Sequence, residues 1–128
     1  TKKNIKFIVQ KSIGTETEGR DIIKGVKISE NGDVLIKIFN KNLTGLGDER
    51  SMQSEAFDIV KNLDEAKIKK MRDIRIVFNT TFVNNYGKES IGHYGIVAVS
   101  KKTRNKLQYD NLYSGDLEGF ADQYVFRK

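Results

Sequence analysis

The sequence predicts an α+β domain, in which a single antiparallel sheet of four or five strands packs against one main helix and short C-terminal helices. Three observations lead to this prediction. Apolar and polar residues alternate at the period of a strand in two paired stretches, 21–40 and 74–99. Between them, residues 51–63 repeat apolar side chains at the period of a helix. The chain of 128 residues has the size of one domain, so 1–128 is predicted to be a single domain.

The N-terminal segment 1–18 is predicted to be a first strand followed by a loop. Ile5, Phe7 and Val9 would share one face of such a strand, and a first helix is the alternative. The polar residues at 15–18 are typical of a loop.

A hairpin is predicted over 21–40, centred on Asn31-Gly32. Asn-Gly is the favoured core of a type I′ turn, because both residues tolerate a positive φ. The apolar residues of the two strands alternate on either side of this turn. They are Ile22, Val26 and Ile28 before it, and Val34, Ile36 and Ile38 after it.

The main helix is predicted to begin at Ser51 and to end near Asn62. Its apolar stripe has the spacing of one helix face, so this face should lie on the sheet. The stripe consists of Met52, Ala56, Ile59, Val60 and Leu63.

A second strand pair is predicted from Ile74 to Val99, around a turn at 84–89. Most apolar residues of its first strand share one face, and Val77 and Val83 lie on the opposite face. Gly92 and Gly95 in the second strand indicate a bulge or a close approach of another part of the chain.

A short basic helix or turn is predicted to follow at 101–107, and a second at 116–124. They belong to a tail rich in aromatic residues, which either folds back over the sheet or forms a recognition surface. The predicted core consists of Phe7, Ile22, Val26, Ile28, Val34, Ile36, Ile38, Ile59, Val60, Leu63, Ile76, Phe78, Ile96 and Val97.

Composition narrows the classes of function. The net charge of +6, from 23 basic and 17 acidic residues, is dispersed as on a lysine-rich soluble surface, and it would also suit an anionic partner. The absence of Cys excludes disulfides, a thiolate nucleophile and Cys-based metal sites. No apolar run reaches the ~20 residues that span a bilayer.

No catalytic constellation is recognisable, so the chain is predicted to be non-catalytic, with no metal and no cofactor. His93 is the single histidine and has no acidic residue at a diagnostic spacing, which favours a half-exposed strand residue over a general base. A hydrolase that uses two carboxylates is a less favoured alternative. The candidate binding residues are aromatic or basic groups of the second hairpin and the tail: Tyr86, His93, Tyr94, Lys101, Lys102, Arg104, Tyr109 and Tyr113.

Several short motifs stand out between about Gly19 and Tyr124. They are Asn42-Leu43-Thr44, Ser51-Met52 with the helix to Leu63, Tyr86-Gly87-Lys88-Glu89, Ser100-Lys101-Lys102, Lys106-Leu107-Gln108-Tyr109-Asp110-Asn111 and Ala121-Asp122-Gln123-Tyr124. In these motifs the chain resembles the membrane-distal domain of small, uncharacterised lipoproteins of Gram-positive bacteria, which often carry Trp at the position of Tyr109 and an aromatic residue at that of Val125. The resemblance implies an extracytoplasmic domain, tethered by a lipid on a Cys upstream of Thr1, and it implies no catalytic residues.

The functional prediction is therefore a non-catalytic binding or structural module of a cell-surface lipoprotein. Its partner would be a protein or a component of the cell envelope, and the membrane would be reached only through the upstream lipid anchor. Binding of nucleic acid through the dispersed basic surface is the alternative. Because the chain opens at Thr1 and not at Met, we expect it to be a processed or trimmed piece of a longer protein.

Overall fold

The computed structural model describes residues 2–17, 20–40 and 49–127, so the motif Asn42-Leu43-Thr44 lies outside the described residues. The predicted α+β class is confirmed by a five-stranded sheet, one main helix and short C-terminal helices. In chain order the elements are α1 (Lys2–Ile13), β1 (Glu16–Thr17), β2 (Arg20–Asp21), β3 (Ile23–Ile28), β4 (Val34–Phe39), α2 (Glu49–Glu65), β5 (Ile74–Val83), β6 (Glu89–Val99), α3 (Lys101–Arg104), the single 3-10 turns η1 (Tyr109–Asn111) and η2 (Ser114–Asp116), α4 (Leu117–Phe120) and β7 (Gln123–Phe126).

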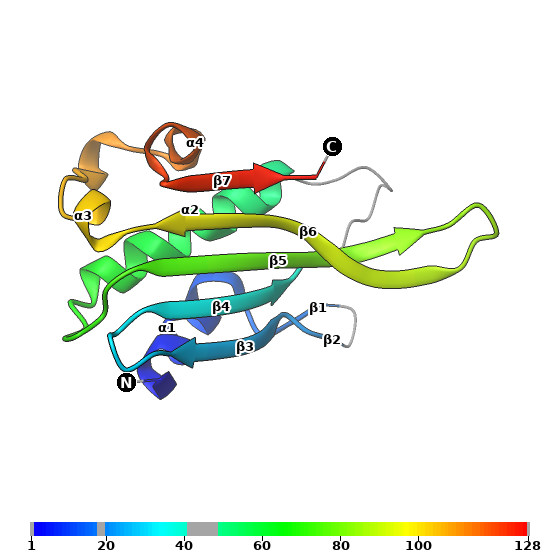
Figure 1. Cartoon of the computed structure of the whole chain (residues 1–128), viewed down its shortest axis with the longest axis horizontal. Coiled ribbons are helices and arrows are strands. Elements are labelled where there is room, and N and C mark those ends of the chain that lie inside the picture. Colours follow the sequence, from blue (N-terminus) through cyan, green and yellow to red (C-terminus); the bar gives the residue numbers. More distant parts are fainter. Residues whose placement is uncertain (1, 18–19, 41–48, 128) are drawn as a thin grey trace.

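The main sheet has the strand order β3-β4-β5-β6-β7, and β1 and β2 form a separate short ribbon (Figure 1). The sheet is mixed and not wholly antiparallel, because β4 and β5 run parallel to each other. This pairing follows from the position of α2 in the chain. A long crossover helix between two neighbouring strands returns the chain to the same end of the sheet, where a tight turn would have reversed it.

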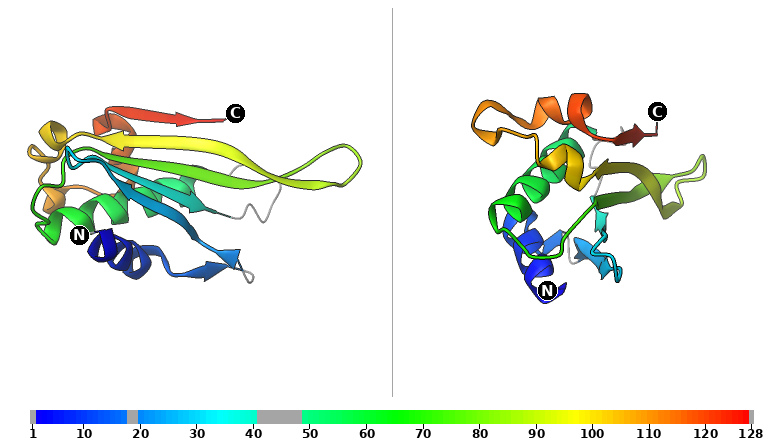
Figure 2. Two further views of the ribbon diagram at one scale, coloured as in Figure 1. Left: turned by 60° about the horizontal axis from the view of Figure 1, so that its bottom comes forward. Right: turned by 60° about the vertical axis from the view of Figure 1, so that its left-hand side comes forward.

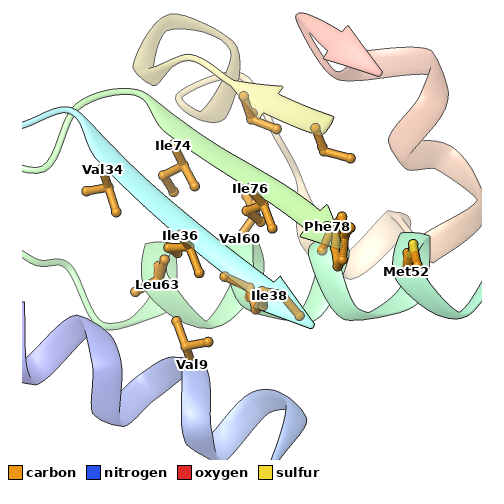
Figure 3. Close-up of a cluster of buried hydrophobic side chains, with 14 of the residues drawn as sticks. Val9, Val34, Ile36, Ile38, Met52, Val60, Leu63, Ile74, Ile76 and Phe78 are labelled. Carbon is orange, nitrogen blue, oxygen red and sulfur yellow. The ribbon is translucent and has the colours of Figure 1, made fainter. Parts of the chain in front are cut away.

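Both long helices lie on the same face of the sheet, as two views of the ribbon show (Figures 1 and 2). The core fills the space between the helices and this inner face, where Val9 of α1 and Leu63 of α2 lie beneath Ile36 of β4 and Ile76 of β5 (Figure 3). The predicted apolar stripe of α2 is confirmed, because each of its residues is buried. In the part of the chain that the structure describes, no helix covers the opposite face of the sheet.

The prediction of a first strand is wrong, because residues 2–13 form the helix α1. Ile5 and Val9 are fully buried against α2 and the sheet, whereas Phe7, which was predicted to be in the core, is 57% exposed. Residues four apart share a helix face and residues two apart do not. The helix therefore places Ile5 and Val9 on the buried face and Phe7 on a different face. A hydrogen bond from Asn62 Nδ2 to Ser12 Oγ, 2.8 Å long, fixes α1 on α2.

The hairpin over 21–40 is confirmed, but its turn differs from the predicted type I′. Gly32 N–H donates to Ser29 O and Ser29 N–H donates to Asp33 O, and only Gly32 in this turn has a positive φ, at 91°. These bonds describe a turn closed by a bulge glycine. Tertiary packing selects it: Arg72 N–H donates to Gly32 O at 2.8 Å, and a Cβ on Gly32 would lie 1.7 Å from Lys70 O.

The second strand pair is confirmed, and it carries the bulge and the close approach that its glycines indicate. The register shifts between Phe78 and Asn79, which leaves Tyr94 as the extra residue on β6. A Cβ on Gly95 would lie 2.2 Å from the ring of Phe126 on β7. Beyond the bulge, β5 and β6 continue as a hairpin arm that projects past the other strands (Figure 1).

The tail folds back on the sheet, but the predicted helix over 116–124 is wrong after Phe120. The helix α4 ends there, and Gln123–Phe126 joins the sheet as β7, antiparallel to β6. The backbone explains the change, since Asp122 N–H donates to Ala98 O and thereby starts the ladder with β6. Among the predicted core residues, Ile28 and Ile96 are only partly buried.

Candidate functional site

The uncovered side of the sheet, called the open face here, consists of the strand residues that point away from α1 and α2. Strand pairing aligns them in two rows across β3 to β7, because paired residues point to the same side. One row is Lys27, Leu35, Arg75, Ala98 and Gln123, and the other is Gly25, Lys37, Val77, Ile96 and Val125.

The half of the open face over β5, β6 and β7 contains an aliphatic row. Val77, Ile96 and Val125 are direct neighbours on these three strands. Val77 and Ile96 are partly exposed, and Val125, on the edge strand, is 55% exposed. This row is an apolar patch on a surface where charged residues are otherwise abundant.

The half over β3, β4 and β5 is cationic, with Lys27, Lys37 and Arg75 on successive strands. Lys24, the extra residue at a bulge in β3, adds its Nζ 5.7 Å from the ring centroid of Phe39. None of the residues in the two rows is a carboxylate. The open face therefore carries cationic side chains on one half and aliphatic side chains on the other.

Three carboxylates border the open face at the end where β4 and β5 begin, and they bind backbone groups of the fold. Asp33 Oδ1 accepts from Asp73 N–H, and Asp73 Oδ1 accepts from Lys101 N–H at 2.9 Å. Asp122 Oδ2 accepts from Ser100 N–H at 2.6 Å, and this bond is the main reason why the pKa of the Asp122 carboxyl lies below its ordinary value. These aspartates hold the ends of neighbouring strands together.

Two shallow hollows adjoin these aspartates, and both are lined by Asp73 and Arg75. The first, of about 500 Å³, extends to Lys27 and Leu35 of the open face. The second, of about 490 Å³, extends to Ala98 and Asp122. Each is open to solvent, so the hollows form an indented border of the open face.

The predicted site residues do not converge on one place. Tyr86 is at the tip of the hairpin arm and is 90% exposed. His93 is exposed on β6 beside Asn79, and within the described residues no carboxylate bonds to it. Lys101 and Lys102 are exposed on α3, and Tyr113 is exposed between η1 and η2.

The other three predicted site residues are engaged inside the fold. Tyr94 is buried between the rings of Phe82 and Phe126, with centroids 6.4 and 5.9 Å away. Arg104 is buried, forms an ion pair with Asp64 and donates to Arg72 O. Tyr109 donates its hydroxyl to the other oxygen of the Asp64 carboxylate.

Burial, and then the hydrogen bond to Asp64, raise the pKa of the Tyr109 phenol above its ordinary value. Tyr124 resembles it, because burial and a 2.9 Å bond from its hydroxyl to Glu49 Oε2 raise the pKa of that phenol as well. Both tyrosines fasten the C-terminal tail to α2.

The open face is not among the sites predicted from the sequence. The indication in the sequence is that each predicted strand has a second face, and Val77 is an apolar residue predicted to lie on it. Lys37 and Arg75 occupy this second face on β4 and β5, in register with Val77 and Leu35. Periodicity predicts which residues lie on this face, but only the position of the helices determines that no helix covers it in the described part of the chain.

Within residues 2–17, 20–40 and 49–127, no cluster of three or more His, Cys, Asp or Glu side chains is placed to hold a metal ion. The same part of the chain contains no helix of the length and apolarity that crossing a membrane requires. No protein-family model, curated protein or solved structure was found to match this chain.

Proposed function

We propose that this chain is a non-catalytic binding module that acts outside the cytoplasm, as part of a cell-surface lipoprotein, and that the open face is its contact surface. The observation that carries the binding role is the two-part surface on β3 to β7, with three aligned aliphatic residues next to cations on three successive strands. A contiguous apolar patch rimmed by polar groups is a common feature of interaction sites. The resemblance to Gram-positive lipoproteins supports the location.

The geometry favours binding over catalysis. The aspartates next to the open face accept hydrogen bonds from backbone N–H groups, and His93 is exposed on a strand. A general base needs a partner that orients it and a site that excludes water around the reacting atoms. A sheet face that no described helix covers supplies an extended contact area instead (Figure 2).

The location is tested with the full-length protein in its native cells. We expect the chain in the membrane fraction, sensitive to a protease that is added to intact cells, and encoded behind a signal peptide with a lipid-accepting Cys. A cytosolic protein control should resist the protease. Recovery of the chain in the cytosolic fraction, protected until the cells are lysed, would refute the proposed location.

Nucleic-acid binding is the second candidate, and the observation that favours it is the set of cations on the open face. Phosphate contacts lose affinity steeply as salt increases. The test is a titration of single-stranded and double-stranded DNA and RNA at low salt. Binding that weakens with salt and is lost in Lys37→Glu would support this candidate, and no binding at low salt would eliminate it.

A further inference from the structure

We infer that the partner of the open face is an acidic protein surface with aliphatic side chains beside its carboxylates. This inference rests on the proposed binding role and adds the chemistry of the partner. The open face supplies the complementary halves: Lys27, Lys37 and Arg75 on one side, and the aliphatic row that begins at Val77 on the other. Complementary charge directs and orients association, while apolar contact supplies affinity.

The two halves meet at β5, which sets the dimensions of the partner. Val77, Ile96 and Val125 lie on three neighbouring strands, so the row spans roughly 10 Å at the usual strand spacing. Arg75 is two residues from Val77 on the same strand, and Lys37 of β4 is paired with Val77. A partner that covers the valines must therefore bring carboxylates to within one strand of them.

The chemistry of the aliphatic half disfavours nucleic acid. Proteins that bind single strands stack the bases on exposed aromatic rings. Neither row of the open face contains an aromatic residue, and Phe39, which follows Lys37 on that side of β4, is 1% exposed. Exposed rings such as Tyr86 and Tyr113 belong to other elements. Phosphates laid over Val77 and Ile96 would be desolvated without a partner.

A second copy of the chain and an anionic membrane fit less well than an acidic protein. Two chains of net charge +6 would bring like charges together if their open faces met. Membrane-surface proteins anchor with Trp, Phe or Leu side chains that reach below the headgroups. The aliphatic row consists of short β-branched side chains on a sheet face, which suits contact with another protein surface.

The experiment titrates the isotope-labelled chain with two designed amphipathic helical peptides and follows the backbone amide shifts. Both peptides have the same leucine face, flanked by Glu in one and by Lys in the other. We expect the Glu peptide to shift amides of β4, β5 and β6 around Lys37, Arg75 and Val77, and the Lys peptide to leave them unchanged. Affinity for the Glu peptide should fall as salt is raised.

Variants identify which half of the open face is responsible. Lys37→Glu and Arg75→Glu should each weaken the Glu peptide by about tenfold, or about 1.4 kcal/mol, and should gain affinity for the Lys peptide. Lys102→Glu makes the same charge change on α3 and should leave both affinities unchanged. Val77→Ser tests the aliphatic half and should weaken binding of the Glu peptide. Thermal melting checks that each variant is folded, and Lys37→Gln replaces Lys37→Glu if that variant unfolds.

Some results would overturn the inference. These are equal binding of both peptides, amide shifts confined to other elements, or an oligonucleotide or anionic vesicle that shifts the open face where the Glu peptide does not. Such results would change the partner and leave the cell-surface location intact. A cytosolic location would instead refute the location and leave the peptide result standing, so the two failures are distinguishable.

Discussion

The carboxylate of Asp64, at the end of α2, binds the guanidinium of Arg104 on α3, 40 residues further along the chain. Only 5% of the Arg104 side chain and 18% of the Asp64 side chain are exposed. The same carboxylate accepts the hydroxyl of Tyr109, and Arg104 also donates to Arg72 O. This cluster joins α2, the loop before β5 and the tail that leads to β7.

Arg104→Ala is expected to lower the free energy of unfolding by about 3 kcal/mol, because it leaves the partly buried Asp64 carboxylate without its counter-ion. Urea denaturation measures the change. Lys102→Ala, an exposed substitution on the same short helix, is the control and should cost under about 0.5 kcal/mol. Equal stability of the two variants would show that the ion pair contributes nothing measurable.

Stability should also fall at high pH through Tyr109. Its pKa is raised in the folded chain, so above the ordinary value of about 10 the unfolded chain loses this proton first. The stabilisation is therefore complete below about pH 10 and is lost as pH rises from there towards the folded pKa. Urea midpoints measured from about pH 8 to pH 11 should decline less steeply in Tyr109→Phe. Because Tyr124 contributes a similar decline, Tyr109→Phe/Tyr124→Phe should be flatter still, and an unchanged slope in both variants would contradict this account.

Gly95→Ala should destabilise the fold by about 2 kcal/mol, because the added methyl group meets the ring of Phe126, 2.2 Å away, where β6 pairs with β7. Gly25→Ala is the matched control on β3, since nothing lies within 4 Å of its Cβ position. It should be neutral or stabilising by up to about 1 kcal/mol, as Ala is preferred over Gly inside a strand. Thermal denaturation compares the two variants, and a larger loss in Gly25→Ala would contradict the packing described here.

Two substitutions in α1 should have different effects on stability if residues 2–13 form a helix and not a strand. Ile5→Ala should cost about 3 kcal/mol, because Ile5 is fully buried. Phe7→Ala should cost under about 1 kcal/mol, since that ring is exposed and Lys11 Nζ lies 5.4 Å from its centroid. Denaturant unfolding measures both, and similar losses in the two variants would indicate that both side chains face the core.

Local periodicity succeeded where an element is long or carries a strong turn signal. The stripe from Met52 to Leu63 spans three helical turns, and no other regular structure places those residues on one side. Local periodicity failed in short segments whose apolar spacing fits both the period of a helix and that of a strand. The spacing of Ile5 and Val9 fits a helix, and the spacing of Ile5, Phe7 and Val9 fits a strand. Only the contact of α1 with α2 distinguishes the helix from the strand.

The candidate site was less accessible from sequence than the fold. The predicted site residues are aromatic or basic, and residues of these types also stabilise a fold from inside. Arg104 and Tyr109 do so by binding the carboxylate of Asp64. Asp64 lies 40 and 45 residues before them, and no local pattern connects them. The position of Val77 in the sequence indicates that its strand has a second face. Whether that face is exposed depends on where helices from elsewhere in the chain pack.

The sequence by itself determined the α2 helix, the two hairpins and the two-sided character of the strands β3 to β6, because these follow from contacts between residues close in the chain. Only the tertiary structure decided which side of the sheet α1 and α2 cover, that β4 and β5 run parallel, and that Gln123–Phe126 joins the sheet. Alternation gives a strand two different faces. Which face meets water is set by where distant helices dock, and that energy comes from contacts made only after the chain has folded.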